Sequence, residues 1–177
     1  MLKAVRCLLD NNFLWGAATA GYQIEGDDIH SQWYEWEKDK AAKLARKAKR
    51  KYGKLPYWSE LQKTANQSSS YQAGKAANSY NEYWRDVKLL KELNMNAYRM
   101  SIEWSRIEPT EGQFDQVAIS HYVEMINLFR KNHIEVMVTL FHFSFPIWFG
   151  RKGGFHFETR LIADSTSMSC TLLIATR

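Results

Sequence analysis

The sequence predicts an α/β protein in which parallel strands alternate with crossover helices. Three apolar, β-branched or aromatic segments have the length of strands: Phe13–Ala20, Ala97–Ile102 and Glu135–Phe141. The longer stretches between them show helical periodicity. This alternation is typical of βαβ units, which place their strands side by side in one parallel sheet.

The first strand is expected in Phe13–Ala20, an apolar run that contains one glycine and follows a polar turn. A long helix should come next, because the stretch after Gln32 becomes rich in Ala, Lys and Arg, which favour helices. Gly53 and Pro56 should end it. Only Leu44 and a few alanines supply an apolar stripe, so we expect a surface helix inserted after the first strand.

This expected helix carries most of the net charge of +5. Lys38–Lys54 holds nine Lys or Arg residues and a single acid, Asp39, while the rest of the chain is mildly acidic. Such a run suits a module that binds nucleic acid or an anionic membrane. It lacks regular aromatic interleaving and has little apolar face, so a solvated insertion is favoured and we expect neither nucleic acid nor a membrane as partner.

The later elements follow from the same periodicities. From Asn78 apolar residues recur at three- and four-residue steps, which predicts a helix before the strand at Ala97–Ile102, and Asn66–Ser70 is expected to be a loop. A second apolar stripe predicts the helix before the third strand: Ala118, Tyr122, Met125 and Phe129.

The two cysteines, Cys7 and Cys170, lie near opposite ends of the chain. They form neither a disulfide framework nor a Cys/His cluster, so we expect no metal, no cofactor and a reducing compartment. Met1–Asp10 is too short and too broken for a signal peptide, and no window is long enough for a membrane span. These features predict a soluble, cytoplasmic protein.

Three segments carry distinctive motifs: FLWGAATAGYQIEG at Phe13–Gly26, YRMSIEWSRI at Tyr98–Ile107, and VTLFHF at Val138–Phe143, which PIWFGRKGGF follows. In this order they resemble glycoside hydrolase family 1. They are similar to the family's first three strands with their loops, and Ser79–Arg99 is similar to its first barrel helix. The resemblance implies a partial (β/α)8 TIM barrel in residues 1–155, about the first three βα units with a helical insertion after strand 1. It also implies a site at the carboxyl ends of the strands.

The same resemblance implies a retaining β-glycosidase of the β-glucosidase type, acting on a β-linked glucoside or galactoside or a small oligosaccharide. Gln23 matches the residue that binds the glycone, and its carboxamide suits two neighbouring sugar hydroxyls. His142 matches a histidine that contacts the same sugar, although Phe143 stands where the family usually has Trp. Without the resemblance, Gln23 is interpreted as a polar loop residue and His142 as a structural histidine.

Arg99 lies inside an apolar strand, where a permanent cation needs a carboxylate partner. The matching family residue pairs with the catalytic nucleophile; the alternative is a structural ion pair, for which Glu25 and Glu103 are candidates. Glu25 is assigned a supporting role without proton transfer. By the resemblance, Trp104 and Arg106 serve packing and barrel closure. Four further residues are able to stack on sugar rings, although buried packing is expected for most of them: Trp33, Trp36, Trp84 and Trp148.

No catalytic carboxylate is expected in this chain. Retaining glycosidases need two carboxylates about 5–5.5 Å apart. The family carries them in Thr-x-Asn-Glu-Pro and Thr/Ile-Glu-Asn-Gly contexts, and neither occurs here; Asn81-Glu82 lies early in a helix and precedes Tyr83. We therefore expect the chain alone to be inactive. A phosphorylated-sugar subtype and a non-catalytic carbohydrate-binding remnant stay open as alternatives.

Composition changes after Phe155. Residues 156–177 are rich in Ser and Thr, contain no Trp or Tyr, and follow no clear amphipathic period. We interpret this segment as a non-homologous tail that arose from a frameshift or a gene-model error.

Overall fold

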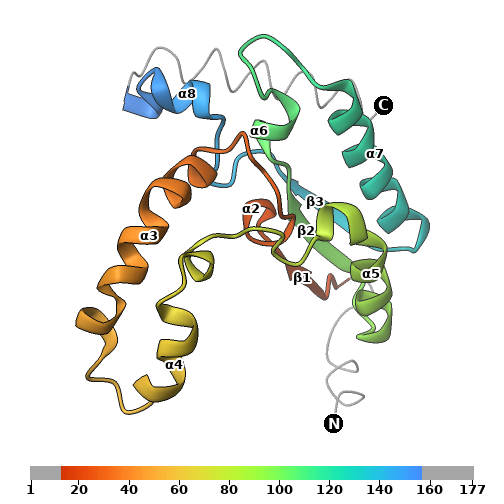
Figure 1. Ribbon diagram of the computed structural model, residues 1–177. Coiled ribbons are helices and arrows are strands. Elements are labelled where there is room, and N and C mark those ends of the chain that lie inside the picture. The colour runs from red at the N-terminus through yellow and green to blue at the C-terminus, as the bar shows by residue number, and fades with distance from the viewer. Residues whose placement is uncertain (1–12, 157–177) are drawn as a thin grey trace.

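A three-stranded parallel sheet lies at the centre of the computed structural model, which describes residues 13–156 (Figure 1). Its strands follow one another in sheet order: β1 (Gly16–Ala18), β2 (Ala97–Ser101) and β3 (Glu135–Thr139). Ala18 pairs with Arg99, which pairs in turn with Met137. The predicted α/β class and parallel sheet are confirmed, and each strand is shorter than the apolar segment that predicted it.

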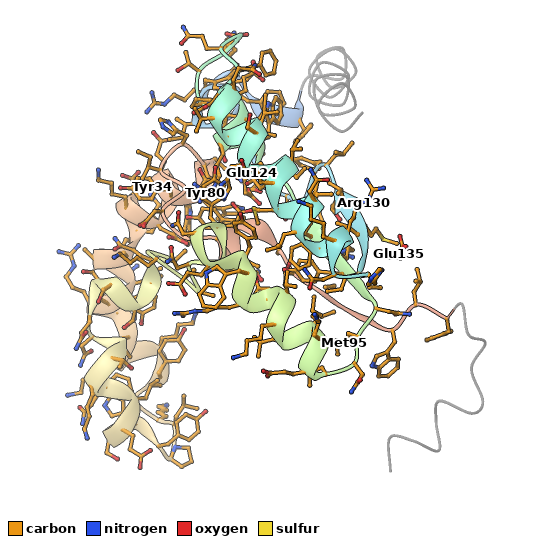
Figure 2. All side chains as sticks on the ribbon, turned by 90° about the vertical axis from the view of Figure 1, so that its right-hand side faces the viewer. Tyr34, Tyr80, Met95, Glu124, Arg130 and Glu135 are labelled. Carbon is orange, nitrogen blue, oxygen red and sulfur yellow. The ribbon has the colours of Figure 1, made fainter. Side chains whose placement is uncertain are left out.

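Helices α5 (Ser79–Glu92) and α7 (Gln116–Lys131) lie together over one face of the sheet (Figure 2). Both occupy the stretches where helical periodicity predicted them. Asp115 caps α7, because its carboxylate accepts hydrogen bonds from two backbone N–H groups of the first turn. Tyr98 of β2 stacks on Phe129 of α7, with ring centroids 4.6 Å apart. The buried core on this face comprises Val87, Leu90, Tyr98, Met100, Ile102, Ile107, Ile119, Tyr122, Met125, Ile126, Phe129 and Ile134.

The opposite face of the sheet carries the cross-strand row Ala18, Arg99 and Met137. Met137 is 61% exposed, and Ala18 is exposed as well. Both β1 and β3 are edges of this sheet. Parallel sheets are usually covered on both faces and have protected edges. The sheet within residues 13–156 therefore has the form of a barrel segment whose inner face is solvent-accessible.

A helical hairpin is inserted between β1 and α5, where the sequence predicts an inserted helix (Figure 1). The elements of this insertion are α2 (Gly21–Ile24), α3 (Gln32–Tyr52), α4 (Trp58–Ala65) and the 3-10 turn η1 (Ser68–Tyr71). Helix α3 ends just before Gly53, as expected, and buries Ala41, Ala45 and Ala48 along one side. Helix α4 was not predicted, and η1 begins in the expected loop.

A second, smaller apolar cluster lies around the segments that follow β2 and β3. These segments contain α6 (Trp104–Ile107), α8 (Ile147–Arg151) and η2 (Gly154–His156). Trp104 and Phe149 form its buried centre, with ring centroids 4.9 Å apart. Within residues 13–156, every helix is too short or too polar to cross a bilayer.

The accessible sheet face gives a testable expectation for the 177-residue polypeptide made on its own. Exposed apolar side chains and unpaired strand edges favour association. We expect oligomers or aggregates in sedimentation-velocity experiments and strong binding of the dye ANS. A micromolar monomer that melts in one sharp cooperative transition would contradict this expectation.

Candidate functional site

The segments that follow the three strands meet at one edge of the sheet, because parallel strands all end on the same side. Gln23 lies on α2, directly after β1, and its side chain is exposed. Arg99 lies on β2, two residues before the strand ends. His142 lies in the loop after β3 and is half-buried. The residues that the resemblance singles out thus come from three neighbouring strands at their carboxyl ends.

Glu103 connects these three strand ends. Its carboxylate accepts a hydrogen bond from the Tyr22 backbone N–H after β1, at 2.9 Å, and another from the Ser144 hydroxyl after β3. Its own backbone N–H donates to the Tyr122 hydroxyl of α7, at 3.2 Å. Glu103 is 1% exposed, so these bonds replace water for a buried carboxylate. This side chain was not predicted to hold the site together.

Gly21 allows this connection, because its backbone passes directly over Glu103. A Cβ atom at this position would lie 2.4 Å from Glu103 Oε1, which is closer than any real contact. The Gly21 N–H also donates to Ser101 Oγ at 2.6 Å. A glycine at this point of the GYQIEG segment is therefore required by close packing between the first and second strand ends.

Glu25 and Arg106 form a buried ion pair beside this connection. The distance from Arg106 Nε to Glu25 Oε2 is 2.8 Å, and the two side chains are 14% and 2% exposed. The Tyr122 hydroxyl also donates to the Glu25 carboxylate, and Arg106 donates to the backbone carbonyl of Gly26. The Arg106 guanidinium lies over the Tyr80 ring, 4.2 Å from its centroid. The expected supporting role of Glu25 agrees with this geometry.

Within residues 13–156 Arg99 forms no ion pair, so the alternative of a structural pair with Glu25 or Glu103 is wrong. Glu25 pairs with Arg106 instead, and Glu103 is bonded to Tyr22 and Ser144. Arg106 is therefore an electrostatic partner and not merely a packing residue. The sequence placed both arginines near the second strand end, but only the helical turn at α6 brings Arg106 back toward the loop after β1.

Five buried side-chain atoms have no hydrogen-bond partner within residues 13–156: Tyr22 Oη, Asp28 Oδ1, Ser79 Oγ, Arg99 Nε and His142 Nδ1. Buried polar atoms are normally satisfied, so each exception calls for an explanation. Two of the five belong to residues of the expected site, Arg99 and His142. Glu25 and Glu103, in contrast, carry hydrogen bonds on both carboxylate oxygens.

The loop after β3 holds His142 next to a residue in an uncommon backbone conformation. Phe143 has φ +67° and is 74% exposed. A bulky residue in the left-handed region costs free energy, and such residues cluster at functional sites. Gln32 of α3 also holds this loop in place. Its side chain donates a hydrogen bond to the Phe143 carbonyl and accepts one from the Phe145 N–H.

Burial dominates the electrostatics of this region. It raises the pKa of Glu103 to about 7, although the hydroxyl of Ser144 partly opposes this. Burial also raises the pKa of Glu25, and Arg106 offsets only part of that effect. The pKa of Asp28 is raised for the same reason, while the Ser105 hydroxyl donates to its carboxylate at 2.5 Å. In the part of the chain that the structure describes, no three Asp, Glu, His or Cys side chains are grouped to hold a metal ion.

The tryptophans only partly follow the expected burial. Trp104 is 3% exposed and donates from Nε1 to Glu108, which agrees with a packing role. Trp33, Trp36 and Trp84 are 41%, 46% and 52% exposed, so the expectation that most of the four candidate stacking residues are buried is wrong. Trp148 is half-buried and donates to the backbone carbonyl of Glu108.

Comparison with known proteins identifies the family. The model of glycosyl hydrolase family 1 matches residues 6–175. The chain belongs to glycosyl hydrolase family 1. The match runs beyond Phe155 into the segment that we interpreted as an unrelated tail; residues 157–177 lie outside the described residues, and that interpretation stays a prediction.

Related proteins and solved structures agree with this assignment. A benzoxazinyl glucoside β-D-glucosidase of Zea mays is 37% identical over 160 residues, which are 87% of this chain and 25% of that protein. A β-glycosidase from Pyrococcus horikoshii has a TM-score of 0.70 and 35% identity, over 93% of this chain and 33% of that one. A family 1 β-glucosidase from Humicola insolens, solved in complex with glucose, has a TM-score of 0.68 and 31% identity over 92% and 31%. The chain thus spans a quarter to a third of these relatives, as a partial TIM barrel should.

The raised pKa of Glu103 predicts how stability depends on pH. Between about pH 4.5 and pH 7 the Glu103 carboxyl keeps its proton in the folded protein but releases it in the unfolded chain. The folded state therefore becomes less stable as the pH rises through that interval. Glu103→Gln keeps the hydrogen-bonding shape and removes the titration. The comparison is made with residues 13–155 in place of the matching segment of the Pyrococcus horikoshii β-glycosidase, so that the open face of the sheet is covered. From pH 4.5 to 7 the variant should lose less stability than the same protein with the wild-type residues, by up to roughly 3 kcal/mol, in urea unfolding followed by circular dichroism.

Glu92→Gln is the matched control, because Glu92 lies exposed on α5. This variant should follow the wild-type pH dependence. Equal pH dependence of Glu103→Gln and wild type would show that Glu103 does not titrate in this interval.

Proposed function

We propose that this chain supplies the first three βα units, and with them part of the sugar-binding edge, of a retaining β-glycosidase of the β-glucosidase type. The observation that carries the proposal is the contrast at the carboxyl edge of the sheet. Glu25 and Glu103 are hydrogen-bonded on both carboxylate oxygens, whereas Arg99 and His142 each keep a buried nitrogen that has no partner in the described part of the chain. Polar atoms without a partner, held beside hydrogen-bonded side chains, are what a ligand-binding edge needs.

In this proposal Gln23 and His142 bind the glycone of a β-linked glucoside or galactoside, or of a small oligosaccharide. The exposed Gln23 carboxamide offers a donor and an acceptor to adjacent hydroxyls. Arg99 faces the inner side of the sheet, in one row with Ala18 and Met137. There its guanidinium would receive the nucleophilic carboxylate and help to keep it ionised.

The resemblance implies two catalytic carboxylates in set sequence contexts, and neither context occurs in these 177 residues. In retaining hydrolysis one carboxylic acid protonates the leaving oxygen, and a carboxylate attacks the anomeric carbon to form a glycosyl-enzyme that water then cleaves. The buried carboxylates of Glu25 and Glu103 are occupied by Arg106, Tyr122, Tyr22 and Ser144. The role of this chain is therefore to bind and to orient.

A second candidate function is carbohydrate binding without hydrolysis. The exposed indoles of Trp33 and Trp36 favour it, because they lie edge to face with centroids 5.9 Å apart and offer surface for stacking on a sugar ring. Glucose titration followed by NMR, with no product release, would support this reading. Binding of phosphorylated aryl β-glucosides, compared with binding of the unphosphorylated compounds, would show whether the site belongs to the phosphorylated-sugar subtype.

A reducing, cytoplasmic location is also part of the proposal. It rests on the two isolated cysteines, Cys7 and Cys170, both of which lie outside the described residues. The Zea mays relative is named as chloroplastic, so a fluorescent fusion is the direct way to observe the location.

The isolated 177-residue chain should not hydrolyse an aryl β-glucoside, because it contributes no acid/base and no nucleophile. Release of nitrophenol should equal that of the buffer blank. Turnover that co-purifies with the chain and is lost on its removal would show that the carboxylates present here suffice.

A chimera tests the sugar contacts. Residues 13–155 replace the matching segment of the Pyrococcus horikoshii β-glycosidase, and kcat/KM for an aryl β-glucoside is measured. Gln23→Ala should lower kcat/KM about 100-fold, since it removes two hydrogen bonds that are each worth roughly tenfold. Gln62→Ala is the matched control, because Gln62 lies exposed on α4 and bonds only the local Ser59 carbonyl. Equal activity of the two variants would rule out a sugar contact for Gln23.

A further inference from the structure

Helix α3 presents a continuous row of cations that the glycosidase function does not use. The row, here called the basic stripe, consists of Lys40, Lys43, Lys47 and Lys51. Spacings of three and four residues place them along one side of the helix. All four are exposed, while Ala41, Ala45 and Ala48 occupy the buried side. Arg46 and Arg50 widen the stripe on its exposed flank, and Lys54 follows in the loop after the helix.

The charge of the basic stripe is not neutralised within the described residues. Asp39 is the single acid between Lys38 and Lys54. None of the ion pairs found in residues 13–156 includes a cation of the stripe or its flank. Lys51 lies over the neighbouring Tyr52 ring, 5.0 Å from its centroid, which leaves its charge in place. A positive field therefore extends from this helix into solvent.

The hairpin carries this charge away from the sheet. Figure 1 shows α3 and α4 projecting together, with their connecting loop as the most distant point of the insertion. That loop contains Lys54 and Tyr57, and Tyr57 is 56% exposed. A tyrosine beside lysines is a combination favoured at the headgroup level of membranes.

The sequence alone favoured a solvated insertion with no membrane partner, but the exposed row without ion pairs on a projecting hairpin points the other way. We propose that the basic stripe docks on a bilayer surface rich in anionic phospholipids. Four to eight Lys or Arg residues on one helix face are typical of such binding. The stripe is about 17 Å long, at 1.5 Å per residue, which exceeds the screening length of about 10 Å at 0.1 M salt. Because α3 uses its alanine side for packing, the helix stays on the surface and contact is electrostatic and sensitive to salt.

The shape of the stripe favours a membrane over nucleic acid. Single-stranded nucleic acids are bound in positively charged grooves with stacking aromatic side chains. The stripe is the convex side of one helix, and its members are all lysines, which act as point charges without the planar fork that recognises bases. A flat layer of phosphates and carboxylates matches this surface.

Vesicle flotation tests the proposal with the full 177-residue chain, because vesicles rise in the gradient while any protein aggregate sinks. The chain should float with vesicles of phosphatidylserine and phosphatidylcholine at 50 mM salt, and stay behind at 500 mM salt or with pure phosphatidylcholine. The triple variant Lys43→Gln, Lys47→Gln and Lys51→Gln should bind about 100-fold more weakly.

The matched control is the triple variant Lys75→Gln, Lys88→Gln and Lys131→Gln, which removes the same charge from exposed sites outside the hairpin. It should float like the wild type, and far-ultraviolet circular dichroism should show equal helix content in both variants. Equal binding of the two variants, or no flotation of the wild type at low salt, would overturn the proposal. Tighter binding of the wild type to duplex or single-stranded DNA than to the anionic vesicles, at equal salt, would identify nucleic acid as the partner and overturn it as well.

Discussion

The position of every loop at the candidate site depends on one buried carboxylate. Glu103 accepts hydrogen bonds from the segments after β1 and after β3, and it belongs to the segment after β2. Its backbone is bonded in turn to Tyr122, which also holds Glu25 in its pair with Arg106. A buried polar network of this kind is stable only when its members are satisfied together. The three strand ends are therefore fixed relative to one another by side chains, and not only by the short strands between them.

The accessible face of the sheet lies next to this network and indicates what the network positions. Residues 13–156 bury one face of the sheet under α5 and α7, and leave Met137 exposed on the other. Membership of glycosyl hydrolase family 1, together with coverage of about a third of the related structures, explains this asymmetry. The exposed row on the sheet belongs to the inside of a barrel, where Arg99 would meet carboxylates from later strands. A rigid carboxyl edge on this third of the barrel is what would allow the remaining strands to complete a precise pocket.

The sequence predicted the helices and strands well where periodicity carries the information. The apolar stripes of α5 and α7 and the apolar strands show which side of each element is buried. This information is contained in a short stretch of sequence. The expected pairing of Arg99 with a catalytic nucleophile stays a prediction. The sequence could not show that Glu25 pairs with Arg106 and not with Arg99, because that choice depends on how α6 turns, far from Glu25 in sequence. The connecting role of Glu103 was missed for the same reason, since its partners Tyr22 and Ser144 are 81 and 41 residues away. Trp33 and Trp84 were expected to be buried because aromatic side chains usually pack inside proteins, but both lie on exposed sides of their helices, α3 and α5.

The central claim is that this edge of the sheet holds one sugar ring between the segments after the first and third strands. A crystal structure of the chimeric β-glycosidase that carries residues 13–155, soaked with glucose, tests this most directly. The account predicts that the Gln23 carboxamide and the His142 imidazole lie within about 2.7–3.2 Å of hydroxyls on the same ring. A ring bound elsewhere, or one that contacts neither side chain while Glu103 keeps its bonds to Tyr22 and Ser144, would contradict it.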